Sequence, residues 1–252
     1  MSKILIKGAK VVNEGQTALL DVLIEGERIA AISANMTVTP DVEVIDASGK
    51  FLLPGCIDDQ VHFREPGLTH KATIGTESKA CLAGGITSFL EMPNTNPQTT
   101  TVQAYNDKLD VAAQTSWVNY GFLFGGTNDN LEEIKAIDPK TTPGLKLFLG
   151  SSTGNMLVDD PNTLKEIFSA FRLPIAVHCE DEQTIRANLA EYVKKFGDDI
   201  PIEYHPDIRS AEACYLSSSK ATALAKETGA RLHVFHLSTA RETALFQNDV
   251  PL

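Results

Sequence analysis

The first 54 residues of the chain carry short apolar runs that alternate with polar positions, and none of these runs has helical periodicity. Glu25-Gly26-Glu27 lies between two of the runs and is a turn signal typical of a β-hairpin. Pro54-Gly55 ends the region. We therefore predict a small β-sheet domain over residues 1–54. Its strands are expected near residues 4–12, 19–24, 28–33, 42–45 and 50–53.

From residue 55 onward the pattern changes, because apolar runs now alternate with segments of helical periodicity. Strand–helix repetition of this kind predicts parallel strands that are joined by helical crossovers. The strands are expected near residues 56–62, 86–92, 117–124, 145–149, 175–179 and 232–237. The helices are expected near residues 74–83, 102–113, 130–137, 161–171, 182–196 and 210–228, and another begins after Ser238.

These segments make up six βα units, whereas a closed (β/α) barrel needs eight. Either the sheet is open, or the last two units lie beyond Leu252. The candidate metal ligands described below favour the second interpretation. We therefore predict an α/β fold in which residues 55–252 form a TIM-like (β/α) barrel that lacks its last two βα units.

Composition narrows the class of function. The 252 residues carry a net charge of −11, which argues against a nucleic-acid partner because phosphate binding needs a basic surface. The sequence shows no signal-peptide pattern and no apolar run long enough to span a membrane. Its four cysteines form no C-x-x-C pair, which favours free thiols in a reducing compartment. We expect a cytoplasmic protein that binds neither nucleic acid nor membranes.

Polar side chains gather on one face of the first predicted barrel strand. Asp58, Gln60, His62 and Arg64 alternate along the chain, so they share a face if the segment is extended. Buried polar groups need partners, and four of them are not core filling. Barrel enzymes carry their active sites at the carboxyl ends of the strands. This strand is therefore the first candidate for chemistry.

Three later strands carry basic or imidazole groups among apolar residues. Lys146 lies inside an otherwise apolar strand, and His178 and His236 end theirs. Groups from separate strands of one barrel converge at its mouth, and neutral imidazoles are common zinc ligands. Other interpretations are a lysine that extends to solvent and histidines that are hydrogen-bonded in the core.

The combined pattern resembles the dihydroorotases of the amidohydrolase superfamily, a resemblance that covers the whole chain. The β-rich first domain resembles the satellite sheet of these enzymes, and the fold implied is a TIM-like barrel of the metal-dependent hydrolase type. The segment Pro54–Gly67 resembles their first metal-binding strand, with its Ile-Asp-x-x-Val-His-x-Arg-Glu-Pro-Gly run. Further matching segments are Glu91-Met92-Pro93-Asn94-Thr95, Gly144-Leu145-Lys146-Leu147-Phe148, Val177-His178-Cys179-Glu180 and His236-Leu237-Ser238.

The resemblance implies a zinc cofactor of one or two ions. By this resemblance His62 would bind the first metal, while His178 and His236 would hold the second. Lys146 would bridge the two as a carbamate, because burial lowers the pKa of a lysine and frees its amine to react with carbon dioxide.

The resemblance also implies a small-molecule substrate. Arg64 and Asn94 would bind its carboxylate, and the reaction would be the reversible conversion of dihydroorotate and N-carbamoyl-aspartate in pyrimidine biosynthesis. The alternatives are a hydantoinase or allantoinase, whose substrate rings carry no carboxylate, and a non-catalytic scaffold that partners aspartate transcarbamoylase. A homodimer is a further hypothesis on partners.

Two departures from the family pattern bear on activity. Gln60 stands where the family usually has a metal-binding histidine, so the first metal site would be weakened, rearranged or empty. The catalytic aspartate of the family is expected beyond Leu252, so residues 1–252 alone are expected to be inactive. Asp58 is either a support for a metal ligand or the cap of its own strand.

Three other residues are left open by the sequence. Glu180 would contact either the site or solvent, and His205 lies in a loop that could approach the site. His233 has the opposite parity to His236 and is expected to pack against the helices.

Overall fold

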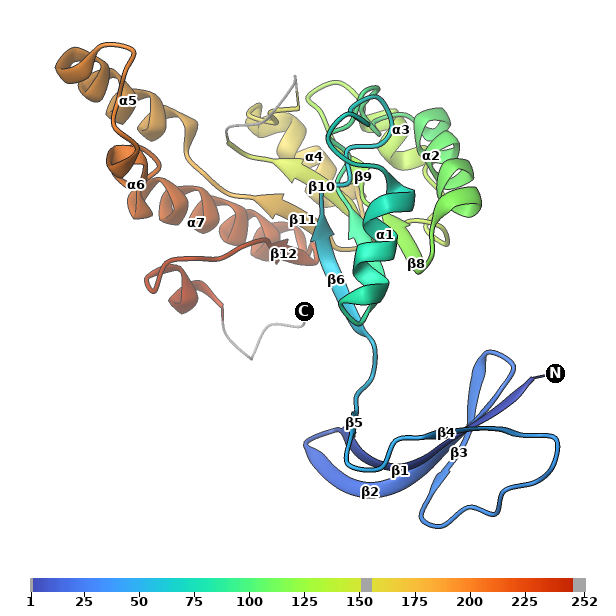
Figure 1. The fold of residues 1–252 in the computed structure, drawn as a ribbon. Coiled ribbons are helices and arrows are strands. Elements are labelled where there is room, and N and C mark those ends of the chain that lie inside the picture. Colours follow the sequence, from blue (N-terminus) through green and yellow to red (C-terminus); the bar gives the residue numbers. More distant parts are fainter. Residues whose placement is uncertain (1, 151–155, 247–252) are drawn as a thin grey trace. The chain divides into compact units, whose positions relative to one another are not determined.

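The computed structural model describes residues 2–150 and 156–246, whose ribbon is drawn in Figure 1. The chain divides into two compact units, Met1–Cys56 and Ile57–Leu252. Within the described residues, no helix combines the length and the apolar character that a membrane span requires.

The first unit is a five-stranded sheet in the order β3-β2-β1-β4, with β5 also paired to β1. β1 and β2 are antiparallel, as are β2 and β3, whereas β4 and β5 run parallel to β1. The predicted hairpin turn at Gly26 is confirmed, because it joins β2 to β3 with a positive φ of 60°. The strands are β1 (Lys3–Asn13), β2 (Gln16–Glu25), β3 (Arg28–Ser33), β4 (Glu43–Asp46) and β5 (Phe51–Leu52).

A bulge in β1 is held by one buried carboxylate. The register between β1 and β2 shifts after Ile6, and the next residues turn through Gly8, whose φ is +71°. Asp21 is 4% exposed and accepts hydrogen bonds from the backbone N–H groups of Gly8 at 2.7 Å and Met36 at 2.8 Å. These two bonds lower the pKa of Asp21, and Lys7 adds to the effect. The interaction ties the turn after β3 to the centre of the sheet.

The second unit is built from strands that follow one another in chain order. β6-β7-β8 form one sheet and β9-β10-β11-β12 a second. β7 runs parallel to β8, and β9, β10, β11 and β12 run parallel to one another. The sheets meet where Leu123 donates its N–H to Glu91 O at 3.0 Å and Phe124 donates to Gly144 O at 3.0 Å. The strands are β6 (Cys56–Val61), β7 (Ile86–Glu91), β8 (Asn119–Phe122), β9 (Phe124–Gly125), β10 (Leu145–Phe148), β11 (Ile175–His178) and β12 (Leu232–Val234).

Helices connect the successive strands, as Figure 1 shows, so the predicted parallel βα arrangement is confirmed. One predicted strand, 117–124, is interrupted at Leu123 and forms β8 and β9. A helix is also expected after Ser238. Between that residue and residue 246, where the described part ends, the chain forms a 3-10 helix, η2 (Glu242–Leu245), and not an α-helix. The helices are α1 (Ile74–Ala83), α2 (Val102–Thr115), α3 (Leu131–Ala136), α4 (Pro161–Ala170), α5 (Glu182–Phe196), η1 (Ile202–Tyr204), α6 (His205–Ile208) and α7 (Ala211–Thr228).

The longer helices begin at residues whose side chains cap them. Each cap accepts a hydrogen bond from a backbone N–H of the first turn, which satisfies a donor that has no partner inside the helix. Asp160 is followed by proline at the first helical position, as the sequence predicts. The caps are Thr73, Thr101, Asp160, Asp181 and Ser210.

The core of the second unit lies between its strands and helices. β10 and the first three residues of β11 are buried, as expected for parallel strands that are covered on both faces. Leu145, Leu147, Ile175 and Val177 are each 0% exposed and belong to this core. Lys146 is the polar exception inside β10, which marks it for closer examination.

Candidate active site

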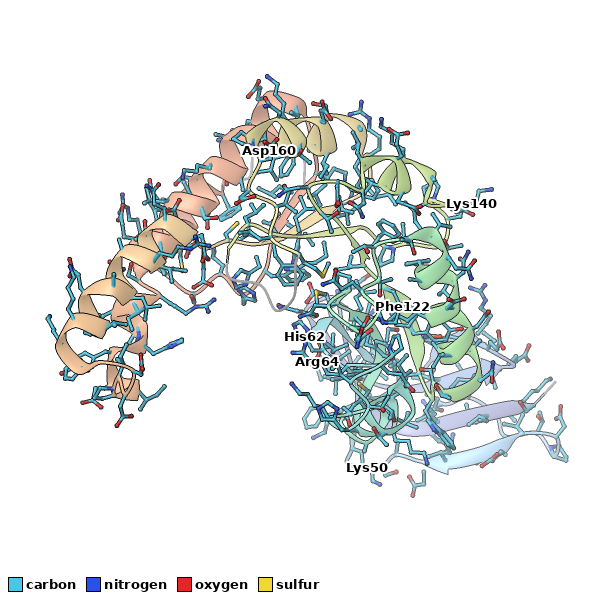
Figure 2. The ribbon with its side chains drawn as sticks, turned by 90° about the horizontal axis from the view of Figure 1, so that it is seen from above. Lys50, His62, Arg64, Phe122, Lys140 and Asp160 are labelled. Atoms are coloured by element: carbon cyan, nitrogen blue, oxygen red, sulfur yellow. The ribbon has the colours of Figure 1, made fainter. Side chains whose placement is uncertain are left out.

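Most of the predicted site residues lie at or just after the carboxyl ends of β6, β7, β11 and β12, whereas Lys146 is the second residue of β10. His62 and Arg64 are on the segment that follows β6 (Figure 2). Asn94 follows β7, and Arg64 and Asn94 line one cavity of about 570 Å³. His178 and His236 line another cavity, of about 320 Å³. The structure therefore brings the predicted residues together in two groups.

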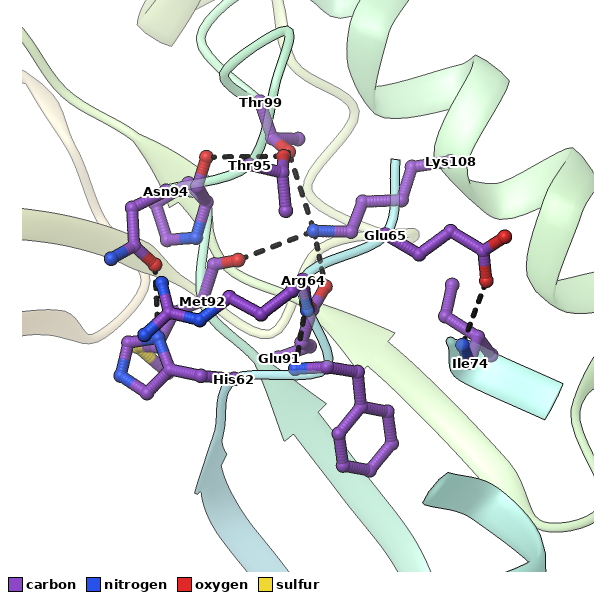
Figure 3. A network of polar contacts seen from close by, with 12 residues as sticks. His62, Arg64, Glu65, Ile74, Glu91, Met92, Asn94, Thr95, Thr99 and Lys108 are labelled. Atoms are coloured by element: carbon purple, nitrogen blue, oxygen red, sulfur yellow. Dashed lines mark hydrogen bonds and ion pairs between the residues drawn. The ribbon is translucent and has the colours of Figure 1, made fainter. Parts of the chain in front are cut away.

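His62 is hydrogen-bonded so that one ring nitrogen is left for another ligand. Its Nδ1 lies 2.9 Å from Oδ1 of Asn94 (Figure 3). The amide oxygen accepts, so Nδ1 carries the proton and Nε2 keeps its lone pair. Burial, followed by the positive charge of Arg64, lowers the pKa of His62 to about 4. His62 is therefore a neutral imidazole at pH 7, which is the form that binds metals.

Arg64 projects from a backbone turn of unusual conformation. Its φ is +68°, in the left-handed region that non-glycine residues seldom adopt. Its side chain extends toward His62 and Asn94 (Figure 3). Next to it, Glu65 accepts a hydrogen bond from the N–H of Ile74 at 2.7 Å, which satisfies a free donor at the start of α1.

Lys146 is buried and lacks a polar partner. Its side chain is 1% exposed, which excludes extension to solvent, and its Nζ has no hydrogen-bond partner among the described residues. The amine lies 4.7 Å from the ring centroid of Phe148 and 4.5 Å from that of Phe235. Burial lowers the pKa of Lys146 to about 7. A large share of the amine is therefore uncharged near neutral pH.

His178 and His236 face each other through ring nitrogens. Nδ1 of His178 lies 3.1 Å from Nε2 of His236. The other nitrogen of His178, Nε2, lies 2.6 Å from Oε2 of Glu180, so it carries the proton that the carboxylate accepts. Nδ1 of His178 therefore directs a lone pair at His236. Burial, followed by the charge on His178, lowers the pKa of His236.

Glu180 in turn is held by Arg209, which pairs with both carboxylate oxygens. Burial alone would raise the pKa of Glu180, but the hydrogen bonds from His178 and Arg209 lower it to about 2. A carboxylate behind a histidine in this way sets the tautomer of the ring. His205, which the sequence places in a loop, is the first residue of α6 and lines the same cavity as Glu180 and His236, so it does approach the site.

The donor types at the site fit a metal ion. Two imidazole nitrogens 3.1 Å apart are spaced as two ligands of one zinc ion at about 2.0–2.1 Å would be. The amine of Lys146, buried without a partner, fits a group that is completed by modification. Within residues 2–150 and 156–246, however, no three His, Cys, Asp or Glu side chains form a metal-binding group. The described residues would thus need the modified lysine to complete the ligand set.

Two neighbouring acidic residues of β6 differ in what they contact. Asp58 accepts a hydrogen bond from the backbone N–H of Gln60 at 3.1 Å, which is the contact expected of a residue that caps its own strand. The neighbouring Asp59 lies 3.4 Å from Nε2 of His233, and both side chains are about half exposed. The expectation that His233 packs against the helices is therefore wrong: it pairs with a residue of β6 instead.

Sequence reasoning missed three charged residues at the site: Glu91, Lys108 and Arg209. Glu91 and Lys108 form an ion pair whose side chains are 1% and 0% exposed. Lys108 could have been found, because it lies three residues after Tyr105 and four before Ala112, on the buried face of α2. Arg209 gave no such signal, since it follows a single helical turn.

Comparison with known proteins places these residues in a wider group. The sequence model of the amidohydrolase family matches residues 51–244. A dihydroorotase from Methanosarcina mazei is 31% identical over 99% of this chain and 54% of its own length. An allantoinase from Deinococcus radiodurans is 32% identical over 96% of this chain and 54% of its own length.

Solved structures agree with the sequence comparisons. The L-hydantoinase from Arthrobacter aurescens superposes with a TM-score of 0.91 and 30% sequence identity. The superposition covers 97% of this chain and 55% of that one. The chain thus spans about half the length of the relatives that it matches, and these relatives include three different cyclic-amide hydrolases.

Proposed function

The chain belongs to the amidohydrolase family, and on this premise we propose that it forms the larger part of the active site of a dihydroorotase. The observation that carries the proposal is the placement of Arg64 beside Asn94 on one cavity, next to the neutral ring of His62. The predicted resemblance to this family is confirmed, whereas the substrate is our proposal.

Arg64 supports an anionic substrate over a neutral one. A guanidinium pairs with a carboxylate through two parallel hydrogen bonds, and Asn94 offers an amide beside it. Dihydroorotate carries a ring carboxylate, whereas hydantoin and allantoin rings carry none. A cation aimed into the cavity would therefore contribute binding energy to dihydroorotate and little to the other two rings.

The second group of residues supports a metal-dependent hydrolase. His62, Lys146, His178 and His236 would hold one or two zinc ions. When bound, zinc would polarise the carbonyl of the ring amide and lower the pKa of water. Asn94 accepts a hydrogen bond from one ring nitrogen of His62, and Glu180 accepts one from a ring nitrogen of His178. The other ring nitrogen of each histidine then carries the lone pair that a metal would bind.

Lys146 would join this set as a carbamate. Its uncharged amine would form a bond to the carbon of carbon dioxide and release one proton, which turns a neutral group into an anionic oxygen ligand. Burial without a polar partner favours this reaction, because it keeps the amine in the uncharged form that reacts.

The direct test is to assay the full-length, zinc-loaded protein on dihydroorotate, hydantoin and allantoin. Turnover of dihydroorotate is expected, and Arg64→Met should raise its KM by about tenfold or more through loss of the paired hydrogen bonds, with zinc content unchanged. Arg64→Lys is the matched control, because it keeps the charge but not the fork. Turnover of hydantoin or allantoin alone would overturn the proposal.

A non-catalytic scaffold that partners aspartate transcarbamoylase is the second candidate. Gln60 on β6 favours it, since glutamine is a weak metal ligand in a position where a histidine is expected. The paired nitrogens of His178 and His236 favour the enzyme. Zinc analysis of the full-length protein separates the two: at least one zinc per chain is expected of the enzyme, and near-zero zinc with tight transcarbamoylase binding supports the scaffold.

A further inference from the structure

The most deeply buried charges of the second unit lie behind the turn that carries Arg64. The side chains of Glu91, on β7, and Lys108, on α2, form an ion pair that is closed off from solvent. A buried ion pair of this kind adds little net stability compared with a well-packed apolar pair, because both charges lose their hydration. The pair therefore calls for an explanation other than stability.

Glu91 holds the turn after β6 directly. Its Oε1 accepts hydrogen bonds from the N–H groups of Phe63 and Arg64, both at 3.1 Å (Figure 3). At Arg64, immediately after the second of these N–H groups, the backbone adopts a left-handed φ of +68°. Such a conformation costs of order 1 kcal/mol or more and persists only where other contacts impose it. The carboxylate of Glu91 supplies those contacts.

Lys108 contacts the loop that carries Asn94. Its Nζ donates to the carbonyl of Met92 at 3.2 Å and lies 3.5 Å from Oγ1 of Thr99. These residues flank Asn94 in the loop between β7 and α2. One buried pair thus contacts both segments that present the proposed carboxylate-binding side chains.

The two segments also touch each other through their backbones. Asn96 donates its N–H to the carbonyl of Pro66 at 3.1 Å. Gly67, with a φ of +80°, packs so closely that an added Cβ would clash with the carbonyl oxygen of Asn96. The distance between the turn and the loop therefore has little freedom to change.

From these contacts we propose that Glu91 and Lys108 are positioning residues that set the distance between Arg64 and Asn94, and thereby the affinity for the anionic group of the substrate. The inference deepens the proposed function and rests on it. Neither residue lines the cavity of Arg64 and Asn94, so both act through the turn and the loop rather than on substrate.

Two double variants of the full-length protein isolate the effect. Glu91→Gln/Lys108→Met and Glu91→Met/Lys108→Met both remove the buried charges and have similar side-chain volumes. Only the glutamine variant keeps a side-chain oxygen that can accept hydrogen bonds from the backbone N–H groups of Phe63 and Arg64. The methionine variant should therefore show a KM for dihydroorotate about tenfold or more above that of the glutamine variant, with kcat within about threefold. Equal KM values in the two variants would overturn the proposal.

A double-mutant cycle that adds Arg64→Met to both variants separates positioning of Arg64 from a general loosening of the fold. If Glu91 acts through Arg64, the methionine variant should have a higher KM than the glutamine variant while Arg64 is present, and almost the same KM once Arg64→Met is added to both. A purely structural role would raise KM by the same factor in both backgrounds, which would contradict the proposal. Glu91→Asp, which keeps the charge but withdraws it by one methylene, provides a second route should the methionine variant fold poorly.

Amide hydrogen exchange provides a readout without substrate. The N–H groups of Phe63 and Arg64 should exchange faster in the methionine variant than in the glutamine variant, while amides inside α4 should be unchanged. Equal exchange at the turn would show that Glu91 does not hold it. If the wild-type protein fails to turn over dihydroorotate, the proposed substrate is wrong, and the exchange result still decides whether Glu91 positions the turn.

Discussion

Two lysines are buried in the second unit, one at each end of the candidate site, and their surroundings are opposite. Lys108, behind the turn of Arg64, is 1% exposed and is paired with Glu91. Lys146, which lies close enough to His62 and His236 to affect the pKa of both, is also 1% exposed and has no polar partner among the described residues. Burial lowers the pKa of both amines, and for Lys108 the carboxylate of Glu91 opposes part of that shift.

The difference shows how one fold can use a buried amine in two ways. A lysine with a buried carboxylate and carbonyl around it makes polar contacts that hold neighbouring segments in place. A lysine among aromatic rings without an acceptor prefers the uncharged form, which is reactive toward carbon dioxide. The end of the site at Arg64 is therefore rigid as it stands, whereas the end at Lys146 needs modification to complete it.

The largest expected effect comes from breaking the paired lysine. Lys108→Met leaves Glu91 buried without its counter-charge, and this should lower the free energy of unfolding of the full-length protein by about 3–5 kcal/mol. Urea denaturation measures it. Lys165→Met is the matched control, since Lys165 pairs with Glu227 at 2.7 Å but both are well exposed, and the loss there should be under about 1 kcal/mol. A similar loss of unfolding free energy in the two variants would show that burial does not make the pair of Glu91 and Lys108 more sensitive than an exposed pair.

An intermediate effect is expected from Glu180, which supports the unpaired end. Glu180→Ala removes the acceptor that keeps the proton of His178 on Nε2, so the ring can turn or change tautomer. Zinc affinity of the full-length protein should fall about 10–100-fold, measured by competition with a chelator. Glu182→Ala, two residues along the chain at the start of α5, removes an ion pair with Arg186 instead and should leave zinc affinity within about twofold. If Glu180→Ala lowered zinc affinity no more than the control variant does, Glu180 would not be supporting the metal site.

The smallest effect concerns pH and the unpaired lysine. The folded pKa of Lys146 is about 7, below its unfolded value of 10.5, so above pH 7 the unfolded chain binds more protons than the folded one. Between pH 7 and 8 the stability of the metal-free full-length protein should therefore gain at most about 1.4 kcal/mol from this group. Lys146→Met should remove that gain, as thermal denaturation at several pH values would show. An identical pH dependence in both proteins would mean that the amine is not buried uncharged.

Much of the second unit could be predicted from the sequence because its periodicity is unambiguous. α1 and α5 begin and end at the predicted residues, and the strand that carries Lys146 was recognised by one charge in an apolar run. The split of β8 and β9 at Leu123 could not be predicted, because the apolar pattern continues through it. The pairing of Asp59 with His233 could not be predicted either. Alternation along a strand predicts the face on which a side chain lies, but not which residue of another strand it contacts.

The sequence by itself determined the elements, their parallel order and the candidate groups at the strand ends, because local periodicity and residue chemistry act over a few neighbours. Only the tertiary structure decided which charges are paired. Glu91 and Lys108 are 17 positions apart, and Lys146 meets Phe235 across 89 positions. The energy of a buried charge depends on what surrounds it in space, and that is settled when distant segments pack together.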